Sequence, residues 1–175
     1  IEGIAYIGEY ALIGDTDEKK QEGLKYLKMA ADRNHIRSIY KLGRVYLDGE
    51  LVGKDYKKGI SYIEFAHQNK NNEATKYLCN AYVFEDKQNL NEAIDICQKN
   101  AANGDMMNQM SLSWAYSNTN DVVKCYAWSS IGLSKASAEK HVGFTEQFRA
   151  LKDICYQSMT KSQIKRANDL INKLK

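Results

Sequence analysis

Apolar and small residues recur along the chain at a nearly constant spacing. A leucine followed four residues later by a tyrosine occurs three times: Leu42 and Tyr46, Leu78 and Tyr82, and Leu112 and Tyr116. The first two pairs are 36 residues apart, and the last two are 34 residues apart. The apolar residues of 72-NEATKYLCNAYVFE-85 also keep the i, i+4, i+7 spacing of one helix face. A repeat of this length is typical of helix–turn–helix units stacked in a solenoid.

Polar capping residues predict where the second helix of each unit begins. Three of them stand four residues before a small side chain: Asp55, Asn89 and Asp121. Short oxygen-bearing side chains at such positions accept hydrogen bonds from the first backbone N–H groups of a helix. Thr160 and Gln163, three residues apart, have the pattern of a capping box. They predict the start of a last helix.

Small residues mark the points where the two helices of a unit are expected to cross. Gly43 on the first helix and Gly59 on the second would meet at one such crossing, and Cys79 and Cys125 take the same place in later units. No C-x-x-C pair occurs among the four cysteines, which are Cys79, Cys97, Cys125 and Cys155. Nothing in this spacing requires disulfides. We therefore expect the cysteines to act as small buried spacers.

The predicted architecture is an all-α, right-handed α-α superhelix, or solenoid, of about ten helices. Four units would occupy residues 1–35, 36–71, 72–105 and 106–137, and C-terminal capping helices would occupy 138–175. The last helix has the polar outer face that an end unit needs. Because Ile1 begins a first helix with no polar cap before it, we expect further units to precede this residue.

The repeat resembles the Sel-1-like repeat, a relative of the tetratricopeptide repeat. The residues that carry this resemblance are Leu42, Gly43, Tyr46, Gly49, Leu51, Val52, Asp55, Lys58, Gly59, Tyr62 and Ala66. The segment 121-DVVKCYAWSSIGLSKA-136 looks like the family's D-x-x-K-A-Y-x-W helix, with Cys125 in place of alanine. The resemblance implies a scaffold for protein complexes. Bacterial proteins of this kind often act in envelope, signalling or host-interaction processes.

Composition and charge narrow the classes of function. Hydrophobic residues make up 43% of the chain and charged residues 27%, as in ordinary globular domains. The net charge of +3 is too small to attract nucleic acid by itself. The longest uncharged stretch, 106-MMNQMSLSWAYSNTN-120, is too short and too polar to span a bilayer.

We predict no catalytic, cofactor-binding or metal-binding residue. His35, His67 and His141 are far apart and lack the spacing of metal ligands, and each is expected in a turn or at the surface. The glycine-rich stretch 41-KLGRVYLDGELVGKDYKKG-59 lacks the G-x-x-x-x-G-K-[ST] order of a phosphate loop. Gly49 and Gly53 are instead expected to shape the turn between two helices. The sequence thus predicts a protein that is not an enzyme and has no small-molecule substrate.

A solenoid presents a concave groove lined by the first helix of each unit, and we predict that this groove binds a peptide or partner protein. The groove positions lie two residues before and after each motif leucine, with two neighbouring cations: Tyr40, Arg44, Lys76, Asn80, Met110, Trp114, Arg37 and Lys41. Arg and Lys can bond a peptide carboxylate. Met110 and Trp114 would form an apolar subsite. A monomer is expected.

Two other functions stay open. The chain could be an accessory or regulatory module of an enzyme or complex encoded elsewhere. RNA binding by helical repeats ranks lower, because acidic residues stand at expected groove positions: Glu9, Asp48 and Glu73. The abundance of Lys, Asn and Ile fits a bacterial source. The sequence leaves the compartment undecided, with periplasm, envelope or secretion slightly favoured over cytoplasm.

Overall fold

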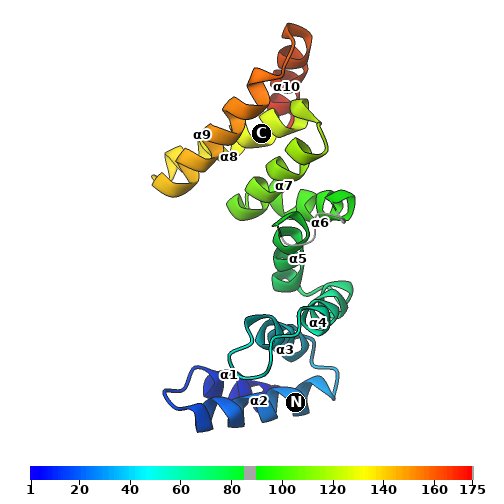
Figure 1. Ribbon diagram of the computed structural model, residues 1–175, viewed down its shortest axis with the longest axis vertical. Helices are drawn as coiled ribbons and strands as arrows, with labels where there is room; N and C mark the ends of the chain where they lie inside the picture. Colours follow the sequence, from blue (N-terminus) through cyan, green and yellow to red (C-terminus); the bar gives the residue numbers. More distant parts are fainter. Residues whose placement is uncertain (85–89, 175) are drawn as a thin grey trace. The chain divides into compact units, whose positions relative to one another are not determined.

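The computed structural model describes residues 1–84 and 90–174 (Figure 1). These residues form ten helices and no strand, which confirms the predicted all-α class. The helices are α1 (Glu2–Leu12), α2 (Asp17–Ala31), α3 (Ile36–Asp48), α4 (Tyr56–Gln68), α5 (Asn72–Phe84), α6 (Leu90–Ala102), α7 (Met106–Asn118), α8 (Val122–Ala138), α9 (Val142–Gln157) and α10 (Lys161–Leu174).

The chain divides into two compact units, Ile1–Leu78 and Cys79–Lys175, with the boundary inside α5. In the N-terminal unit, α1 packs against α2, α2 against α3, and α3 against α4. In the C-terminal unit, α6 packs against α7, and α8 packs against α7, α9 and α10. Within α1–α4 and within α6–α9, helices next to each other in the sequence are therefore neighbours in space. This is the packing that a helical repeat needs to bury its apolar faces.

The core of the N-terminal unit is built on the apolar positions of the repeat. Leu24 of α2 packs with Leu42 and Val45 of α3, and all three are buried. Two partly buried tyrosines extend this cluster, Tyr46 and Tyr62, whose rings stack with centroids 5.8 Å apart. The leucine and tyrosine of the motif are thus packing residues, as their helical spacing predicts.

The close crossing of α3 and α4 depends on two glycines. A Cβ atom on Gly43 would lie 2.9 Å from the carbonyl oxygen of Gly59, and one on Gly59 would lie 2.9 Å from the carbonyl oxygen of Gly43. No side chain fits in that space. The predicted meeting of these two residues is confirmed.

Side-chain caps begin the helices where the sequence places them. Asp55 accepts a hydrogen bond from the Lys58 N–H at 3.0 Å, and Asp121 accepts one from the Lys124 N–H at 3.1 Å. Thr160 and Gln163 form the predicted capping box at the start of α10. The predicted cap Asn89 lies outside the described residues. In the turn after α3, Gly49 has a φ of 77°, a left-handed conformation that favours glycine.

The four cysteines form two disulfides, so the prediction that they are only small spacers is wrong. Cys79 of α5 bonds to Cys97 of α6, and Cys125 of α8 bonds to Cys155 of α9. The paired Cα atoms are 5.0 and 6.2 Å apart, within the range that a disulfide spans. Helix packing brings together cysteines that are 18 and 30 residues apart in the sequence. Spacing alone could not reveal these pairs.

None of the helices in the described part of the chain is both long and apolar enough to cross a membrane.

Candidate partner-binding site

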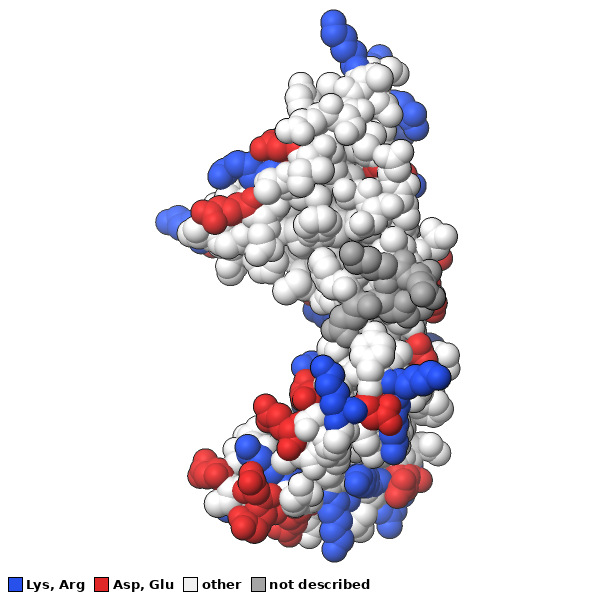
Figure 2. All heavy atoms as spheres, in the orientation of Figure 1, with Lys and Arg blue, Asp and Glu red and all other residues white. Residues whose placement is uncertain are grey.

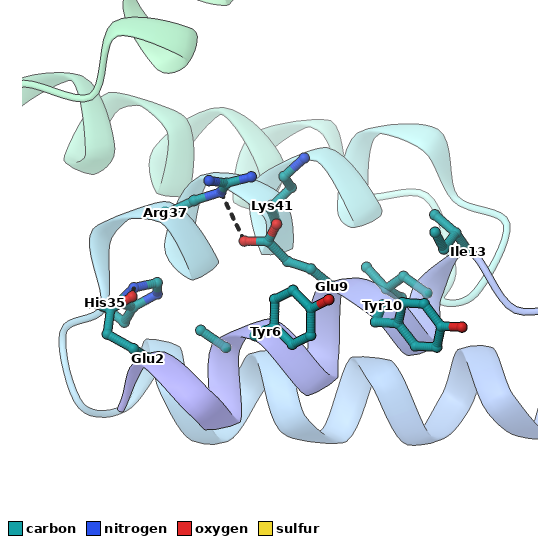
Figure 3. Close-up of a pocket in the computed structure, with 10 residues that line it drawn as sticks. Glu2, Tyr6, Glu9, Tyr10, Ile13, His35, Arg37 and Lys41 are labelled. Atoms are coloured by element: carbon teal, nitrogen blue, oxygen red, sulfur yellow. Dashed lines mark ion pairs between the residues drawn. The ribbon is translucent and has the colours of Figure 1, made fainter.

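A pocket of about 510 Å³ lies between α1 and α3 in the N-terminal unit. Figure 3 shows its two sides, with Tyr6 and Tyr10 of α1 and the following residue Ile13 on one side, and Arg37 and Lys41 of α3 on the other. His35 and Glu2 close one end of it. Both helices are first helices of their repeats, so the pocket occupies the face where the groove is expected.

The apolar floor of the pocket comes from one face of α1. Tyr6, Tyr10 and Ile13 are at i, i+4 and i+7, a spacing that puts them on the same side of a helix. Their exposed fractions are 72%, 69% and 76%, although side chains of this size are usually at least half covered. The two tyrosine rings are stacked with centroids 6.5 Å apart. The result is a contiguous exposed apolar surface, the kind of feature that marks an interaction site.

Charged groups surround this floor. Arg37 Nε lies 2.8 Å from Glu9 Oε1, an ion pair that connects α3 to α1 (Figure 3). His35 Nε2 lies 3.4 Å from Glu2 Oε2. Lys41 also lines the pocket and is half-buried, and no carboxylate of residues 1–84 or 90–174 forms an ion pair with it. The rim therefore carries one cation whose charge is not compensated by a salt bridge.

A third cation on α3, Arg44, is held by aromatic side chains. Its guanidinium carbon lies 4.8 Å from the centroid of the Tyr77 ring on α5, and its Nη2 lies 3.8 Å from Asp48 Oδ1. Burial alone would lower the pKa of Arg44, but the hydrogen bond to Tyr40 and the electrostatic interactions with Tyr40, Asp48 and Tyr77 raise it above its ordinary value. Arg44 is thus a fixed positive charge next to the pocket, although it does not line it.

Charges of both signs are mixed over the N-terminal unit in the face that Figure 2 presents. The visible face of the C-terminal unit is mostly uncharged (Figure 2). A long-range field of one sign is not present on this face.

The arrangement of the helices matches known structures. A Sel1 repeat protein from Oxalobacter formigenes has a similar structure, with a TM-score of 0.61 and 19% sequence identity over 99% of this chain and 88% of that one. The chain has the Sel-1-like repeat fold. No sequence model of a protein family matches the chain, and no curated protein matches it either.

A second solved structure is similar at a lower score. It is a protective antigen present in uropathogenic Escherichia coli strains, described as displaying an SLR fold, with a TM-score of 0.51 and 17% identity. The similarity covers 97% of this chain but only 44% of the antigen. The chain therefore spans less than half the length of the antigen chain.

The predicted groove residues of the N-terminal unit differ in their location and in their exposure to solvent. Arg37 and Lys41 line the pocket, and Arg44 lies beyond them on the same face of α3. Lys76 is exposed on α5. Tyr40 is buried, with an exposed fraction of 7%, so the prediction that it is an exposed groove residue is wrong. Its hydroxyl supports Arg44, which places Tyr40 under the surface that a partner would touch.

In the C-terminal unit, the predicted subsite is only partly exposed. Trp114 and its neighbour Met107 are exposed by 38% and 47%, but Met110 is buried at 3%. Every residue from 108 to 113 is buried, because α7 packs against α6, α8 and α9. Asn80 is half-buried, and its side-chain oxygen accepts a hydrogen bond from Ser111. The prediction of Met110 as an exposed contact is therefore wrong, and Asn80 has an internal partner.

The tyrosines of α1 are the site residues that the sequence prediction missed. A signal was available, because Ile7 and Gly8 match Leu42 and Gly43 at a shift of 35 residues. That shift puts Tyr6 at the helix position of Lys41, which borders the groove. Of the acidic residues expected in the groove, Glu9 does line the pocket. The described residues contain no cluster of His, Cys, Asp or Glu that could hold a metal ion.

Proposed function

We propose that this protein is a non-enzymatic interaction module that binds an extended segment of a partner protein in the α1–α3 pocket. The observation that carries the proposal is the exposed row of Tyr6, Tyr10 and Ile13 beside two cations of α3. The Sel-1-like repeat fold supports it, because stacked helical repeats present extended concave surfaces for binding.

The physical gain comes mainly from covering the tyrosines. Aromatic side chains and arginine dominate the binding energy of protein interfaces, since they bury a large surface at a low cost in conformational entropy. Tyr6 and Tyr10 already stack on each other, so their rings are partly ordered before a partner arrives. A pocket of about 510 Å³ accommodates one or two side chains of a partner segment.

The two disulfides indicate the kind of cellular compartment in which this binding takes place. Disulfides form and persist in oxidising compartments and are rare in a reducing cytosol. All four cysteines are paired and almost fully buried. We therefore place the interaction in a bacterial periplasm or outside the cell, the compartments that the sequence slightly favours.

A selection experiment tests the proposed function directly. The oxidised chain is immobilised, and a phage-displayed library of random short peptides is selected on it. Enriched peptides should bind about tenfold or more weakly to a Tyr6→Ser/Tyr10→Ser variant, because the aromatic anchors are lost. Phe65→Ser is the matched control, since Phe65 is exposed on α4 and lies outside the pocket. Equal loss in both variants, or no enrichment, would exclude the pocket as the binding site.

A further inference from the structure

We infer that the α1–α3 pocket selects peptide segments in which a bulky apolar side chain lies within two residues of an aspartate or glutamate. The inference rests on the proposed function and adds the chemistry of the partner to it. It follows from three features of the pocket: the state of its charges, the exposure of its floor, and its size.

The charges of the pocket leave one position open for an anion. Glu9 forms an ion pair with Arg37, and Glu2 lies 3.4 Å from a ring nitrogen of His35, which carries a positive charge only when it is protonated. Lys41 alone has no such partner among the residues that the structure describes, and its side chain is half-buried. Partial removal from water makes an ammonium group without a counter-charge unfavourable, and makes its attraction to an incoming carboxylate stronger than in bulk water. A carboxylate of the partner placed next to Lys41 would neutralise this charge.

The floor of the pocket requires an apolar group next to that carboxylate. Tyr6, Tyr10 and Ile13 are each more than two-thirds exposed, and all three line the same pocket. A leucine, phenylalanine or tyrosine of the partner would cover this surface. A purely acidic segment would leave the floor exposed and would form only a partly solvated ion pair, which contributes little on its own.

The size of the pocket sets the spacing of the two groups. The ring centroids of Tyr6 and Tyr10 on the floor are 6.5 Å apart, and Lys41 lines the same pocket from α3 (Figure 3). An extended peptide advances roughly 3.3 Å per residue, so two residues span roughly 7 Å. The apolar side chain and the carboxylate must therefore be adjacent or separated by one residue to reach the floor and Lys41 together.

A basic segment is disfavoured by the same arrangement. It would meet Arg37 and Lys41 on α3, and the carboxylate of Glu9 that could receive it is already 2.8 Å from Arg37. Like charges brought together at an interface oppose binding and so contribute to specificity. The pocket thus disfavours a lysine or arginine next to Lys41, and Glu2 at the other end is the carboxylate still open to a basic group.

Parallel selections test the inference. The random peptide library is selected on the wild-type chain, on Lys41→Met, and on the control Lys25→Met, which removes an exposed lysine of α2 outside the pocket. Wild type and Lys25→Met should enrich peptides with a bulky apolar residue within two positions of Asp or Glu. Lys41→Met should keep the apolar preference and lose the acidic one. One enriched peptide is then synthesised with its acid changed to the amide, which should weaken binding to wild type roughly fivefold and leave binding to Lys41→Met unchanged.

The possible outcomes separate the two proposals. Enrichment of apolar peptides without an acid, lost on Tyr6→Ser/Tyr10→Ser, would overturn the acidic preference and leave the proposed function standing. An acidic preference that persists in Lys41→Met would also overturn the role of Lys41. No enrichment, or enrichment that ignores the tyrosines, would overturn both.

Discussion

The disulfide between Cys79 and Cys97 lies at the position that Gly43 and Ile63 occupy in the preceding repeat. Cys79 follows Gly43 by 36 residues and Cys97 follows Ile63 by 34, the shifts of the repeat itself. A Cβ atom on Gly43 would lie 2.7 Å from Ile63 Cγ1, so the two positions are in direct contact. In the N-terminal unit this crossing is secured by close packing, whereas between α5 and α6 it is secured by a covalent bond.

Reduction of the disulfides should destabilise the C-terminal unit. A disulfide closes a loop and so lowers the entropy of the unfolded chain, which stabilises the folded state. The expected gain in stability is about 3 kcal/mol for the 18-residue loop and about 4 kcal/mol for the 30-residue loop. Thermal unfolding followed by circular dichroism, with and without a reductant, measures the difference. The Cys79→Ser/Cys97→Ser variant is the matched control and should respond less to the reductant.

Counting thiols provides an independent check of the pairing. Oxidised chain that is unfolded in denaturant without reductant should show no free thiol, since all four cysteines are paired. Four free thiols in protein recovered from an oxidising compartment would contradict the pairing and the compartment inferred from it.

Gly43→Ala should lower stability although alanine favours helices. The new methyl group would contact the Gly59 carbonyl oxygen at 2.9 Å and Ile63 Cγ1 at 2.7 Å, so α3 and α4 must move apart. Overpacking of this kind costs about 1–3 kcal/mol, which exceeds the gain of about 1 kcal/mol in helix propensity. Urea unfolding of the chain measures the change.

Gly3→Ala is the matched control for that substitution. Gly3 lies in α1 and no atom lies within 4 Å of a Cβ built on it. Only the propensity gain remains, and because Gly3 is the second residue of α1, stability should rise by less than the roughly 0.5–1 kcal/mol expected in the middle of a helix. If Gly43→Ala were as favourable as Gly3→Ala, the close crossing of α3 and α4 would be refuted.

The C-terminal unit should lose stability at alkaline pH. The hydrogen bond that the Lys124 ammonium donates to Asp121 raises the pKa of Lys124 above 10.5, and burial raises the pKa of Tyr116 above 10.0. Both raised values favour the protonated form in the folded state. Their contributions are therefore complete below pH 10.0 and are lost as pH rises through the raised values. Urea unfolding between neutral pH and pH 11 measures the effect.

Substitution of one of these groups provides the control. Tyr116→Phe removes the phenol that burial keeps neutral, so the alkaline loss should become smaller in this variant. An identical pH dependence in wild type and Tyr116→Phe would show that the tyrosine does not contribute.

The sequence predicts the fold well because its information is local and repeated. The motif leucines and tyrosines keep helical spacing, and the caps Asp55, Asp121 and Thr160 stand where their helices begin. The pairing of cysteines is not local. Cys125 and Cys155 come together only because α9 packs against α8, and no sequence motif predicts that contact.

The candidate site is predicted less well, because exposure depends on how many neighbours a helix has. Tyr40 and Met110 occupy groove positions by register, yet neighbouring side chains and helices cover them. At a shift of 35 residues, Tyr10 corresponds to Val45, which is buried in α3, yet Tyr10 is open in the first repeat. The repeat pattern gives the register of each position, but only the packed structure gives its exposure.

The most direct test of the account is to map where a bound peptide lies. A peptide selected on the wild-type chain is titrated into isotope-labelled protein, and backbone amide shifts are recorded by NMR. The largest shifts should fall on the facing residues of α1 and α3, at Tyr6, Tyr10, Arg37 and Lys41. Shifts confined to α2, α4 or the C-terminal unit would contradict the assignment of the α1–α3 pocket as the partner-binding site.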